Sequence, residues 1–593
     1  MKYETRSDGR RELVIDSFGG LDRASALCGG QGSFELRNFR PMEDGTLLRR
    51  EGLVPAVTMQ EQIRGAIGIE RNGTDEIYVV AGSGVYYVYE DTVGYTTTTI
   101  GSLKTDSGLV TFLCYDGALL MQDGQQLYTL TPTSADVTEA YVPLYGNGWP
   151  SSSSVPTTAH TVYELPNQLS RRLRIGCVMD EDSRYIALPI LSPETVDALL
   201  IDGVPYTGNF SYSASPHLIS MNDELAAGTK VEVYVTMPAE FFKHADEVKS
   251  ARRMATLGRA EEEQVMFYGL SDTAQVYISR VPEKALQVNV RTVVPTACML
   301  YVTEQDKMTI GDGVHAVTGA CRHYDRSLIF TARGTWMSDG SRLEDGTLSL
   351  IPVNTVLGCS SEGAVALSGN APITVQSSHV LCWNSKTDER DECNAAPISR
   401  PIETLLRADF GKRAAVFSHA VRGEIWFYVP DTAGRILIYQ SERERWTSFD
   451  GFAPRCVFRM GDRVGIAMEK TLYYMEEAAT ADTLVTDEHP EGERVGIVAE
   501  YKSSFLDFGV STRQKRMCRA AVVASCDRAA LRLCLYNVNG RKQERELAGD
   551  GNEISLMQTR GWIGRFRFLR VGIVFDQDSP LRLHEIRLSA HSG

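Results

Sequence analysis

Apolar and polar residues alternate along this chain in short runs that tight turns interrupt. In residues 65–90 an apolar strand, a polar turn and a second strand rich in tyrosine and valine follow one another. Alternation with a period of two indicates half-buried β-strands, and the clusters of Gly, Asp, Asn and Ser between the runs indicate turns. Helical periodicity is confined to residues 239–255 and 398–410. The pattern therefore predicts an all-β protein.

The strand–turn–strand unit recurs along the chain at intervals of roughly 40–60 residues, which is typical of propeller blades. The units are residues 65–90, 110–130, 254–279, 319–339, 365–384, 414–449 and 456–476. A small antiparallel sheet cannot bury both faces alone, whereas sheets stacked around an axis bury their faces and leave only short edges. The recurrence predicts a β-propeller of about six to eight blades. A series of β-sandwiches is the structural alternative.

Two regions interrupt this rhythm. Residues 145–238 open on a linker rich in Gly, Ser, Pro and Thr and continue as alternating strands, which predicts a small inserted β-sandwich. Residues 495–588 carry five alternating strands, which predict a C-terminal β-sandwich or jelly-roll-like domain. The predicted domains are an N-terminal arm with the first blades (1–144), the inserted β-domain (145–238), the remaining blades (239–490) and the C-terminal β-sandwich (491–593).

Composition narrows the function. A chain of 593 residues exceeds a single core, and its formal net charge of −15 makes it a poor candidate for wrapping DNA. An acidic surface is still compatible with a channel through which DNA slides. The 12 cysteines form no C-x-x-C pair and mostly lie in apolar runs, as buried free thiols in a reducing compartment do. With no apolar run of signal-peptide or membrane-spanning length, we expect folding in a cytoplasm and no membrane span.

The common catalytic arrangements are missing from the sequence. It has no G-x-S-x-G, H-E-x-x-H, P-loop or Rossmann glycine pattern. Cys321 and His323 are too few for a zinc site, and the acidic run 180–182 lacks the spacing of an EF-hand. Sialidase-like S-x-D-x-G-x-x-W turns place Trp last, whereas Trp336 precedes the turn 338–340 here. We therefore expect no enzymatic activity, no catalytic residues, no cofactor and no metal.

Basic residues cluster at four places. The sequence pattern favours solvated strand faces at these clusters, and the alternative is contact with phosphates or with an acidic partner ring. In the last cluster arginines alternate with Phe566, Phe568 and Leu569, as expected of a half-buried strand with one charged face. The clusters are Arg49 with Arg50; Arg171, Arg172 and Arg174; Lys515 with Arg516; and Arg565, Arg567 and Arg570.

Several segments resemble proteins of phage genomes. Residues 15–22 (IDSFGGLD) and 38–52 (NFRPMEDGTLLRREG) resemble an entry signature in which a GGLN-like turn precedes N…dG.l..R.G, with Asp22 in place of the Asn. Residues 326–340 are similar to a blade carrying R…if.G…..SD. The final strands, WIGRFRFLRVGIVFDQDSPLRLHEIRLSA, resemble those of packaged-DNA stabilisation proteins, the tail hub or nozzle proteins of short-tailed phages.

The resemblance implies a β-propeller with added β-domains that forms a homo-oligomeric ring at the head–tail junction or tail tip of a bacteriophage. As a structural virion component assembled in the host cytoplasm, it would bind portal, adaptor and other tail proteins. The ring would continue the portal channel and retain packaged DNA until ejection, with non-specific DNA passage through it.

Two alternatives remain open. One is a virion-borne propeller that binds a carbohydrate or host receptor, in which exposed aromatic rings stack on sugars; the candidates are Tyr86, Tyr87, Trp149 and Tyr206. The other is a propeller glycoside hydrolase, which needs a pair of carboxylates across a cleft.

Overall fold

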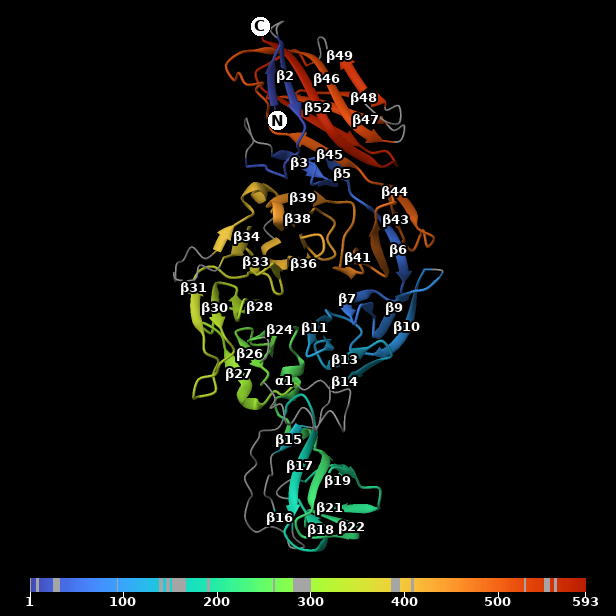
Figure 1. Ribbon diagram of the computed structural model, residues 1–593, viewed down its shortest axis with the longest axis vertical. Helices are drawn as coiled ribbons and strands as arrows, with labels where there is room; N and C mark the ends of the chain where they lie inside the picture. Colours follow the sequence, from blue (N-terminus) through green and yellow to red (C-terminus); the bar gives the residue numbers. More distant parts are fainter. Residues whose placement is uncertain are drawn as a thin grey trace. The chain divides into compact units, whose positions relative to one another are not determined.

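The structure, a computed structural model, describes residues 2–6, 10–24, 32–92, 94–137, 142–144, 150–151, 167–188, 192–259, 262–280, 300–384, 395–406, 410–526, 530–548, 555–558 and 563–592. Most of these residues lie in strands and the helices are short, which confirms the all-β class. The chain divides into two compact units (Figure 1). Unit 1 contains Met1–Gly82, Tyr86–Thr99 and Leu357–Gly593, and unit 2 contains Ser83–Val85 and Ile100–Val356.

The helical stretches are shorter than the sequence predicts. The first yields a 3-10 helix, Ala239–Phe241, and the α-helix α1, Ala245–Lys249, before strand β24 begins at Arg253. Segments this short are marginal as helices on their own, and α1 buries only Val248. The second yields a 3-10 helix, Arg400–Leu405, and α3, Phe410–Arg413. Further 3-10 turns among the described residues are Glu304–Asp306 and Ser441–Arg443.

Unit 2 contains three four-stranded antiparallel sheets in which each strand pairs with the next one along the chain. The first is β11 (Thr111–Tyr115), β12 (Ala118–Gln122), β13 (Leu127–Thr131) and β14 (Ser134–Val137). The second is β24 (Arg253–Leu257), β25 (Gln264–Tyr268), β26 (Gln275–Ile278) and β27 (Lys307–Thr309). The third is β28 (Val317–His323), β29 (Arg326–Thr331), β30 (Gly334–Ser338) and β31 (Ile351–Asn354).

Unit 1 contains four groups of four strands with the same up-and-down pairing. One is β7 (Ile63–Arg71), β8 (Thr74–Ala81), β9 (Gly84–Glu90) and β10 (Tyr95–Ser102). Another is β32 (Val365–Ser368), β33 (Ala371–Gln376), β34 (His379–Trp383) and β35 (Ala395–Pro397). The third is β36 (Ala415–His419), β37 (Glu424–Tyr428), β38 (Ile436–Gln440) and β39 (Arg445–Phe449). The last is β40 (Cys456–Met460), β41 (Arg463–Met468), β42 (Thr471–Glu476) and β6 (Gly52–Thr58).

Each of the seven predicted strand–turn–strand units coincides with one of these sheets, and the middle strands are buried on both faces. In β25, Val265 and Phe267 pack against the sheet before it, while Met266 and Tyr268 pack against the sheet after it. Successive side chains of a strand point to opposite faces, so a sheet lying between two neighbours needs an unbroken apolar run. This explains why QVMFY is buried throughout.

Within each unit the first strand of one sheet contacts the first strand of the next. In unit 2 the contacts run from β11 to β24 and from β24 to β28. In unit 1 they run from β32 to β36, from β36 to β40 and from β40 to β7. Unit 2 therefore stacks three sheets in chain order, and unit 1 stacks four.

The sheet of β40, β41 and β42 takes its fourth strand from the opposite end of the sequence. Strand β6 pairs with β42 in antiparallel register from Thr58–Thr471 to Gly52–Glu476. Leu53 of β6 is fully buried in a core with Trp426 and Tyr473. The N-terminal segment thus completes the last sheet along the chain.

The described residues between 142 and 236 form two sheets within unit 2. The larger has the order β15-β17-β23-β19-β20, with β16 also paired to β17, and the smaller has the order β18-β22-β21. Both sheets contribute to one core, which includes Ile175, Ile186, Ile219 and Val233. The strands are β15 (Val142–Leu144), β16 (Pro150–Ser151), β17 (Arg172–Met179), β18 (Ser183–Ala187), β19 (Thr195–Ile201), β20 (Val204–Pro205), β21 (Phe210–Ser213), β22 (Leu218–Leu225) and β23 (Lys230–Thr236).

The C-terminal strands of unit 1 share two sheets with the first 49 residues, and we call this part the terminal module. One sheet has the order β1-β2-β52-β46-β49, with β5 joined to β52, β4 to β5 and β50 to β46. The other continues from β39 through β3, β45, β51, β47 and β48. The added strands are β1 (Lys2–Thr5), β2 (Arg10–Ile15), β3 (Ser33–Arg37), β4 (Phe39–Pro41), β5 (Leu47–Arg49), β45 (Ala499–Ser503), β46 (Lys515–Cys526), β47 (Ala530–Asn537), β48 (Lys542–Ala548), β49 (Ser555–Gln558), β50 (Arg565–Phe566), β51 (Leu569–Phe575) and β52 (Leu581–Ser592).

The sequence did not indicate that both ends of the chain meet in one module. Figure 1 shows β2 (blue) beside β52 (red), and the two strands pair from Ile15–Ile586 to Arg10–His591. Strand β3 pairs in parallel with β39 and antiparallel with β45, so a continuous sheet links the module to the sheet of β36–β39. A short hairpin, β43 (Ala481–Leu484) and β44 (Glu493–Gly496), follows β42.

Candidate functional site

The best-defined cluster of buried polar side chains lies in unit 1, where the N-terminal segment crosses from the terminal module to β6. We call it the junction. Asn38 stands between β3 and β4 with a φ of 55°, a left-handed conformation that Asn tolerates. Its amide nitrogen donates to Asp450 Oδ1 (2.6 Å) and to the Val498 carbonyl (2.8 Å). Its amide oxygen accepts from Arg50 Nε (3.1 Å) and from the Asp450 backbone N–H (2.9 Å). The amide is therefore fully hydrogen-bonded.

Arg50 is the second element of the junction, and its guanidinium is almost completely inaccessible. It donates two parallel hydrogen bonds to Asp482, of 2.8 Å to Oδ1 and 2.6 Å to Oδ2, and its remaining donors reach Asn38 and backbone carbonyls. The guanidinium also lies over the ring of Phe452, 5.1 Å from its centroid. Asp482 Oδ1 accepts a further bond from the Leu53 N–H (3.0 Å). This bidentate pair fastens β6 and β43 to the end of β39.

A second buried ion group lies beside it. Arg40 approaches Glu51 (3.3 Å) and Glu424 (3.2 Å), and Arg422 approaches Glu51 (2.6 Å). Burial alone would raise the pKa of Glu51, but Arg40 and Arg422 outweigh it and hold that pKa below its usual range. Burial, and next the charge of Arg422, lowers the pKa of His419, whose Nδ1 accepts from the Arg422 N–H (3.3 Å).

The arginines and Glu51 of these two groups carry permanent charges. Guanidinium groups stay protonated at accessible pH, and Glu51 stays ionised because its pKa is lowered. Acid–base catalysis needs a group whose pKa lies near the working pH, and the lowered pKa of Glu51 makes it a poor candidate. The arrangement therefore fastens elements together.

The junction gives a physical account of the segment 38–52. Asn38 and Arg50 are its hydrogen-bonding ends, and Gly45, at a φ of 82°, makes the turn between β4 and β5. A Cβ on Gly52 would lie 2.2 Å from the Ala481 carbonyl oxygen, so only glycine fits there. Asp482, the partner of Arg50, was not identified from the sequence; its only signal is a lone acid in an apolar strand.

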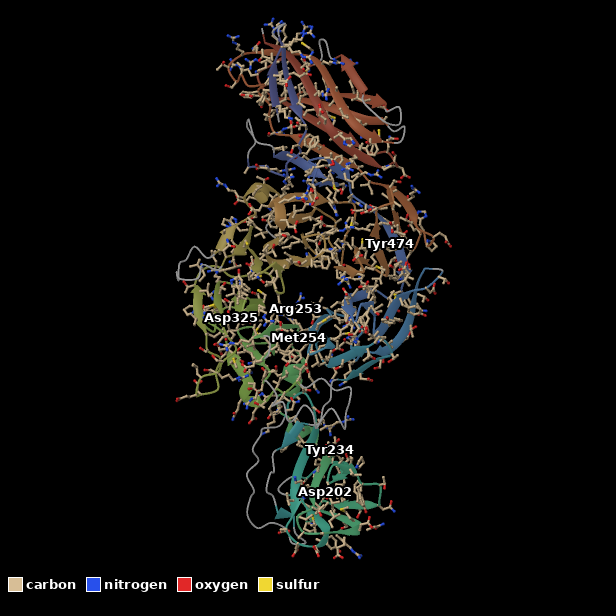
Figure 2. All side chains as sticks on the ribbon, in the orientation of Figure 1. Asp202, Tyr234, Arg253, Met254, Asp325 and Tyr474 are labelled. Carbon is tan, nitrogen blue, oxygen red and sulfur yellow. The ribbon has the colours of Figure 1, made fainter. Side chains whose placement is uncertain are left out.

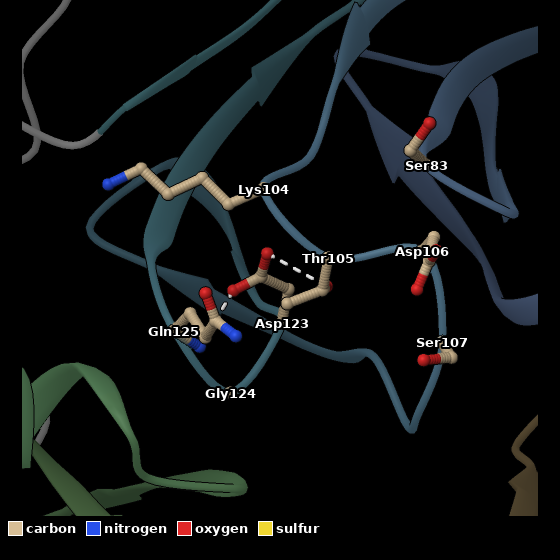
Figure 3. A pocket seen from close by; sticks show the side chains of 8 residues that line it. All are labelled: Ser83, Lys104, Thr105, Asp106, Ser107, Asp123, Gly124 and Gln125. Carbon is tan, nitrogen blue, oxygen red and sulfur yellow. Dashed lines mark hydrogen bonds between the residues drawn. The ribbon is translucent and has the colours of Figure 1, made fainter.

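A polar pocket of about 430 Å³ opens in unit 2, between the loop that precedes β11 and the turn between β12 and β13. Figure 3 shows its lining, with the Asp123 carboxylate facing Thr105. That carboxylate accepts from Thr105 Oγ1 (3.0 Å) and from the backbone N–H groups of Gln125 (2.9 Å) and Gln126 (2.7 Å). Asp123 therefore serves to stabilise the turn.

The candidate metal ligands do not come together. Cys321 and His323 lie on β28, half-buried and buried. Asp180, Glu181 and Asp182 are exposed in the turn between β17 and β18, where Asp182 Oδ1 accepts from the Ala227 N–H (2.8 Å). In the part of the chain that the structure describes, no three His, Cys, Asp or Glu side chains are grouped as a metal site would require.

The turn 338–340 after β30 is stabilised locally. Asp339 Oδ1 accepts from the Ser341 N–H (3.0 Å) and hydroxyl (2.6 Å), and Gly340 has a φ of 86°. These contacts are those of an Asx-type turn.

The expectation of solvated basic faces is wrong for Arg49 with Arg50 and for Lys515, whereas Arg516 is exposed. Arg49 donates to the carbonyls of Gln577 (2.7 Å) and Thr480 (2.5 Å), and burial lowers its pKa to about 10. Arg50 is buried in the junction, and Lys515 is 1% exposed. These side chains are anchors because strand pairing covers them with distant segments. Arg171 fits the expectation better, since it pairs with the exposed Glu194.

Residues 565–570 do not form one strand. Strand β50 ends at Phe566, and β51 begins at Leu569. Arg565 and Arg567 are exposed, whereas the Arg570 guanidinium lies 3.5 Å from the ring centroid of Phe34 and 4.3 Å from that of Phe505. Burial, and next the charge of Arg23, lowers the pKa of Arg570 to about 10.

Of the aromatic candidates, Tyr86, Tyr87 and Tyr206 are half-buried, and Trp149 lies outside the described residues. The Tyr87 ring stacks against that of Tyr89, which is 40% exposed, with centroids 6.0 Å apart. The nine cysteines among the described residues are free thiols. No helix within the described ranges is long and apolar enough to cross a membrane.

No protein-family model matches this chain, and no curated protein matches it. Solved structures similar to it include PorZ, a bacterial surface component of the type IX secretion system of Porphyromonas gingivalis, at 8% identity and a TM-score of 0.37. That match covers 86% of this chain and 46% of the other, so this chain spans less than half of its length. The CNH domain of AfRom2 matches at 8% identity and a TM-score of 0.33, over 72% of this chain and 99% of the domain. The core factor of S. cerevisiae matches at 10% identity and a TM-score of 0.35, over 75% of this chain and 63% of the other. TM-scores of this size do not establish a shared fold.

Proposed function

We propose that this chain is a non-enzymatic structural protein whose seven four-stranded sheets close into one β-propeller. The observation that carries the proposal is the pairing of β6 with β42, by which the N-terminal segment completes the last sheet. A strand shared between the two ends of a chain is a direct way to hold a wheel of sheets closed, because closure removes the exposed edges. The stacking of three sheets in unit 2 and four in unit 1 supports the same architecture.

The two additional β-modules complete the proposal as β-sandwiches. The terminal module is tied to the sheets by the pairing of β3 with β39, where Arg37 lies opposite Ser448, and by the junction around Asn38 and Arg50. Buried, fully hydrogen-bonded polar groups restrict the relative motion of the elements they join. A module held in this way keeps a fixed position relative to the sheets that it joins, which a structural scaffold requires.

We place this scaffold in a bacteriophage tail or head–tail connector, as a homo-oligomeric ring that continues the portal channel and retains packaged DNA. The support for this placement is the resemblance of residues 15–22, 38–52 and 562–590 to tail nozzle and hub proteins. Portal, adaptor and other tail proteins are its proposed partners. The virion is its proposed location.

Electron microscopy of the purified full chain tests the architecture, and a disc of seven lobes around a central hole is the expected view. An open arc of sheets would overturn the closed propeller. Mixing the chain with a phage portal protein tests the placement, with discrete rings expected on the portal. A chain that stays monomeric and enters no ring or particle would overturn the virion role while leaving the fold intact.

Carbohydrate binding is the second candidate function, and one observation favours it. Tyr87 and Tyr89 present stacked rings on β9, with Tyr89 exposed. Flat aromatic faces of this kind pack on apolar sugar faces. A glycan array probed with the full chain tests it, and a hit that disappears on Tyr89→Ala would support this reading over a purely structural one.

A further inference from the structure

One end of the terminal module gathers arginines that the sequence scatters. Strand β46 pairs with β50 so that Lys515 faces Phe566 and Arg516 faces Arg565. Lys515 and Phe566 are buried, whereas Arg516 and Arg565 are exposed. Residues directly opposite on antiparallel strands project from the same face of the sheet. Arg516 and Arg565, 49 positions apart in the chain, therefore stand side by side on the solvent face.

The same row continues across the sheet. On its other side Arg516 pairs with His591 of β52, and His591 in turn pairs with Arg10 of β2. Both of these residues are exposed. Four neighbouring strands thus place arginine, histidine, arginine and arginine at matched positions. Figure 2 shows nitrogen-tipped side chains projecting from the module.

A buried lysine holds the flanking segments in place. Lys515 Nζ donates to the carbonyl of Arg513 (2.9 Å) and to the carbonyl of Arg567 (2.8 Å). The side chains of Arg513 and Arg567 are exposed. Because Lys515 is only 1% exposed, it fixes the backbone from which both guanidinium groups extend. Arg519 of β46 is also exposed, and it pairs with Ser589, two positions from His591 on β52 and therefore on the same face. We call the five residues Arg513, Arg516, Arg519, Arg565 and Arg567 the arginine cluster.

The cluster forms no ion pair with a described residue. Within the described ranges none of its five guanidinium groups lies within 4.0 Å of a carboxylate, whereas Arg6 and Arg587 on the same face are paired with Glu12 and Glu585. Like charges directly opposite on neighbouring strands destabilise a sheet, so the facing pair Arg516–Arg565 weakens the free protein. An anion bound across the pair would relieve that repulsion.

The composition around the cluster decides the kind of anion. Residues 491–593 carry 17 basic and 12 acidic residues. Their net charge is therefore positive, whereas that of the whole chain is −15. At physiological salt, charges act over about 8–10 Å, and the local excess therefore governs binding. Stable protein interfaces need apolar and aromatic anchors. None of the exposed large hydrophobic side chains of the described residues belongs to β46 or β50. Single-stranded nucleic acid also needs aromatic platforms.

We propose that the arginine cluster binds duplex nucleic acid through its phosphate backbone, without reading sequence. Arginine forks match phosphate oxygens bidentately, and interfaces with duplexes are polar and strongly positive. This goes beyond the proposed scaffold and does not depend on ring formation. It also revises the expectation that an acidic chain binds DNA poorly, because the fold gathers positive charge in one place while the net charge of the whole chain is negative.

Fluorescence anisotropy of the full-length chain with a labelled duplex of about 20 base pairs tests this, with sodium chloride varied from about 50 to 200 mM. Each neutralised phosphate adds about −0.9 to the slope of log K against log salt, so five arginines give a slope of about −4.5 and a loss of about 500-fold over that range. Arg516→Gln with Arg565→Gln is expected to reduce the slope by about 2 and to weaken binding at least tenfold.

The matched control is Arg532→Gln, a half-buried arginine of the same module that is paired with Glu544 and Asp576. It is expected to leave the slope unchanged. The melting temperature of the double variant should equal or exceed that of the wild type, since the variant removes a repulsion, and this excludes misfolding as the cause. The proposal would be overturned if the chain failed to bind the duplex at about 50 mM salt, or if the double variant kept the wild-type slope. It would also be overturned if the chain bound polyglutamate, an acidic polypeptide, and the duplex could not displace it.

Discussion

Replacing Asp482 by alanine tests the junction most directly, because it removes one carboxylate and leaves the Arg50 guanidinium buried. The two side chains are 3% and 1% exposed. The substitution breaks the bonds of 2.8 and 2.6 Å from Arg50 and the 3.0 Å bond from the Leu53 N–H. Bonds to charged groups contribute about 1.5–3 kcal/mol each, and breaking one side of a buried pair costs about 3–5 kcal/mol. We expect a loss of about 4 kcal/mol in the free energy of opening this region, or about a thousandfold.

Hydrogen exchange measured by mass spectrometry gives this quantity locally, which suits a chain of several modules that need not unfold in one step. Peptides covering β39 and β43 are expected to exchange about a thousandfold faster in Asp482→Ala. Asp487→Ala is the control, because Asp487 is 95% exposed and lies 3.7 Å from Lys470, so its loss should change exchange by less than about threefold. Exchange in Asp482→Ala within about threefold of wild type at both peptides would refute the buried-pair reasoning.

Three further predictions follow from the same structure. The pKa of His419 is lowered from 6.5, so near that pH the unfolded chain binds a proton more readily than the folded chain. The free energy of unfolding should therefore fall as pH drops below about 6.5, by up to about 1.4 kcal/mol per pH unit, and urea titrations of His419→Gln should show a shallower fall. A Cβ on Gly68 would lie 1.7 Å from the Arg459 carbonyl oxygen, so Gly68→Ala should lower the thermal midpoint by several degrees, whereas Gly434→Ala, which has open space, should not. Burial raises the pKa of Cys177 to about 12, so iodoacetamide at pH 8 should label the exposed Cys114 and spare Cys177, as peptide mass spectrometry would show.

The local part of the fold could be predicted from the sequence because strands and turns are local features. The runs at 254–279 and 456–476 alternate clearly, and both form the predicted strands. The helix predicted over 239–255 was too long, because Met254 and Leu257 belong to the alternation of β24. Periodicity in a short apolar stretch cannot separate a helix from a buried strand.

The non-local part could not be predicted, since it depends on pairing between segments hundreds of residues apart. The sequence of β6 does not indicate that it pairs with β42, and the sequence of β2 does not indicate that it pairs with β52. The same limit explains why Arg50 was expected in solvent. Its burial follows from Asp482, which strand pairing brings to it from 432 positions away. The facing of Arg516 and Arg565 likewise exists only once β46 and β50 pair.

The segment 38–52 resembles an entry signature of phage tail proteins, and its key residues have structural roles in this chain. Asn38, Arg50 and Gly52 are each required by a buried contact: a left-handed turn, a bidentate pair and a close backbone approach. Residues with those roles are inaccessible to any partner, so a motif built from them reports how the N-terminal segment crosses from the terminal module to β6. An architecture held in this way does not by itself fix function. What this chain binds must then depend on exposed positions such as Arg513 and Arg516, which lie outside the segment 38–52.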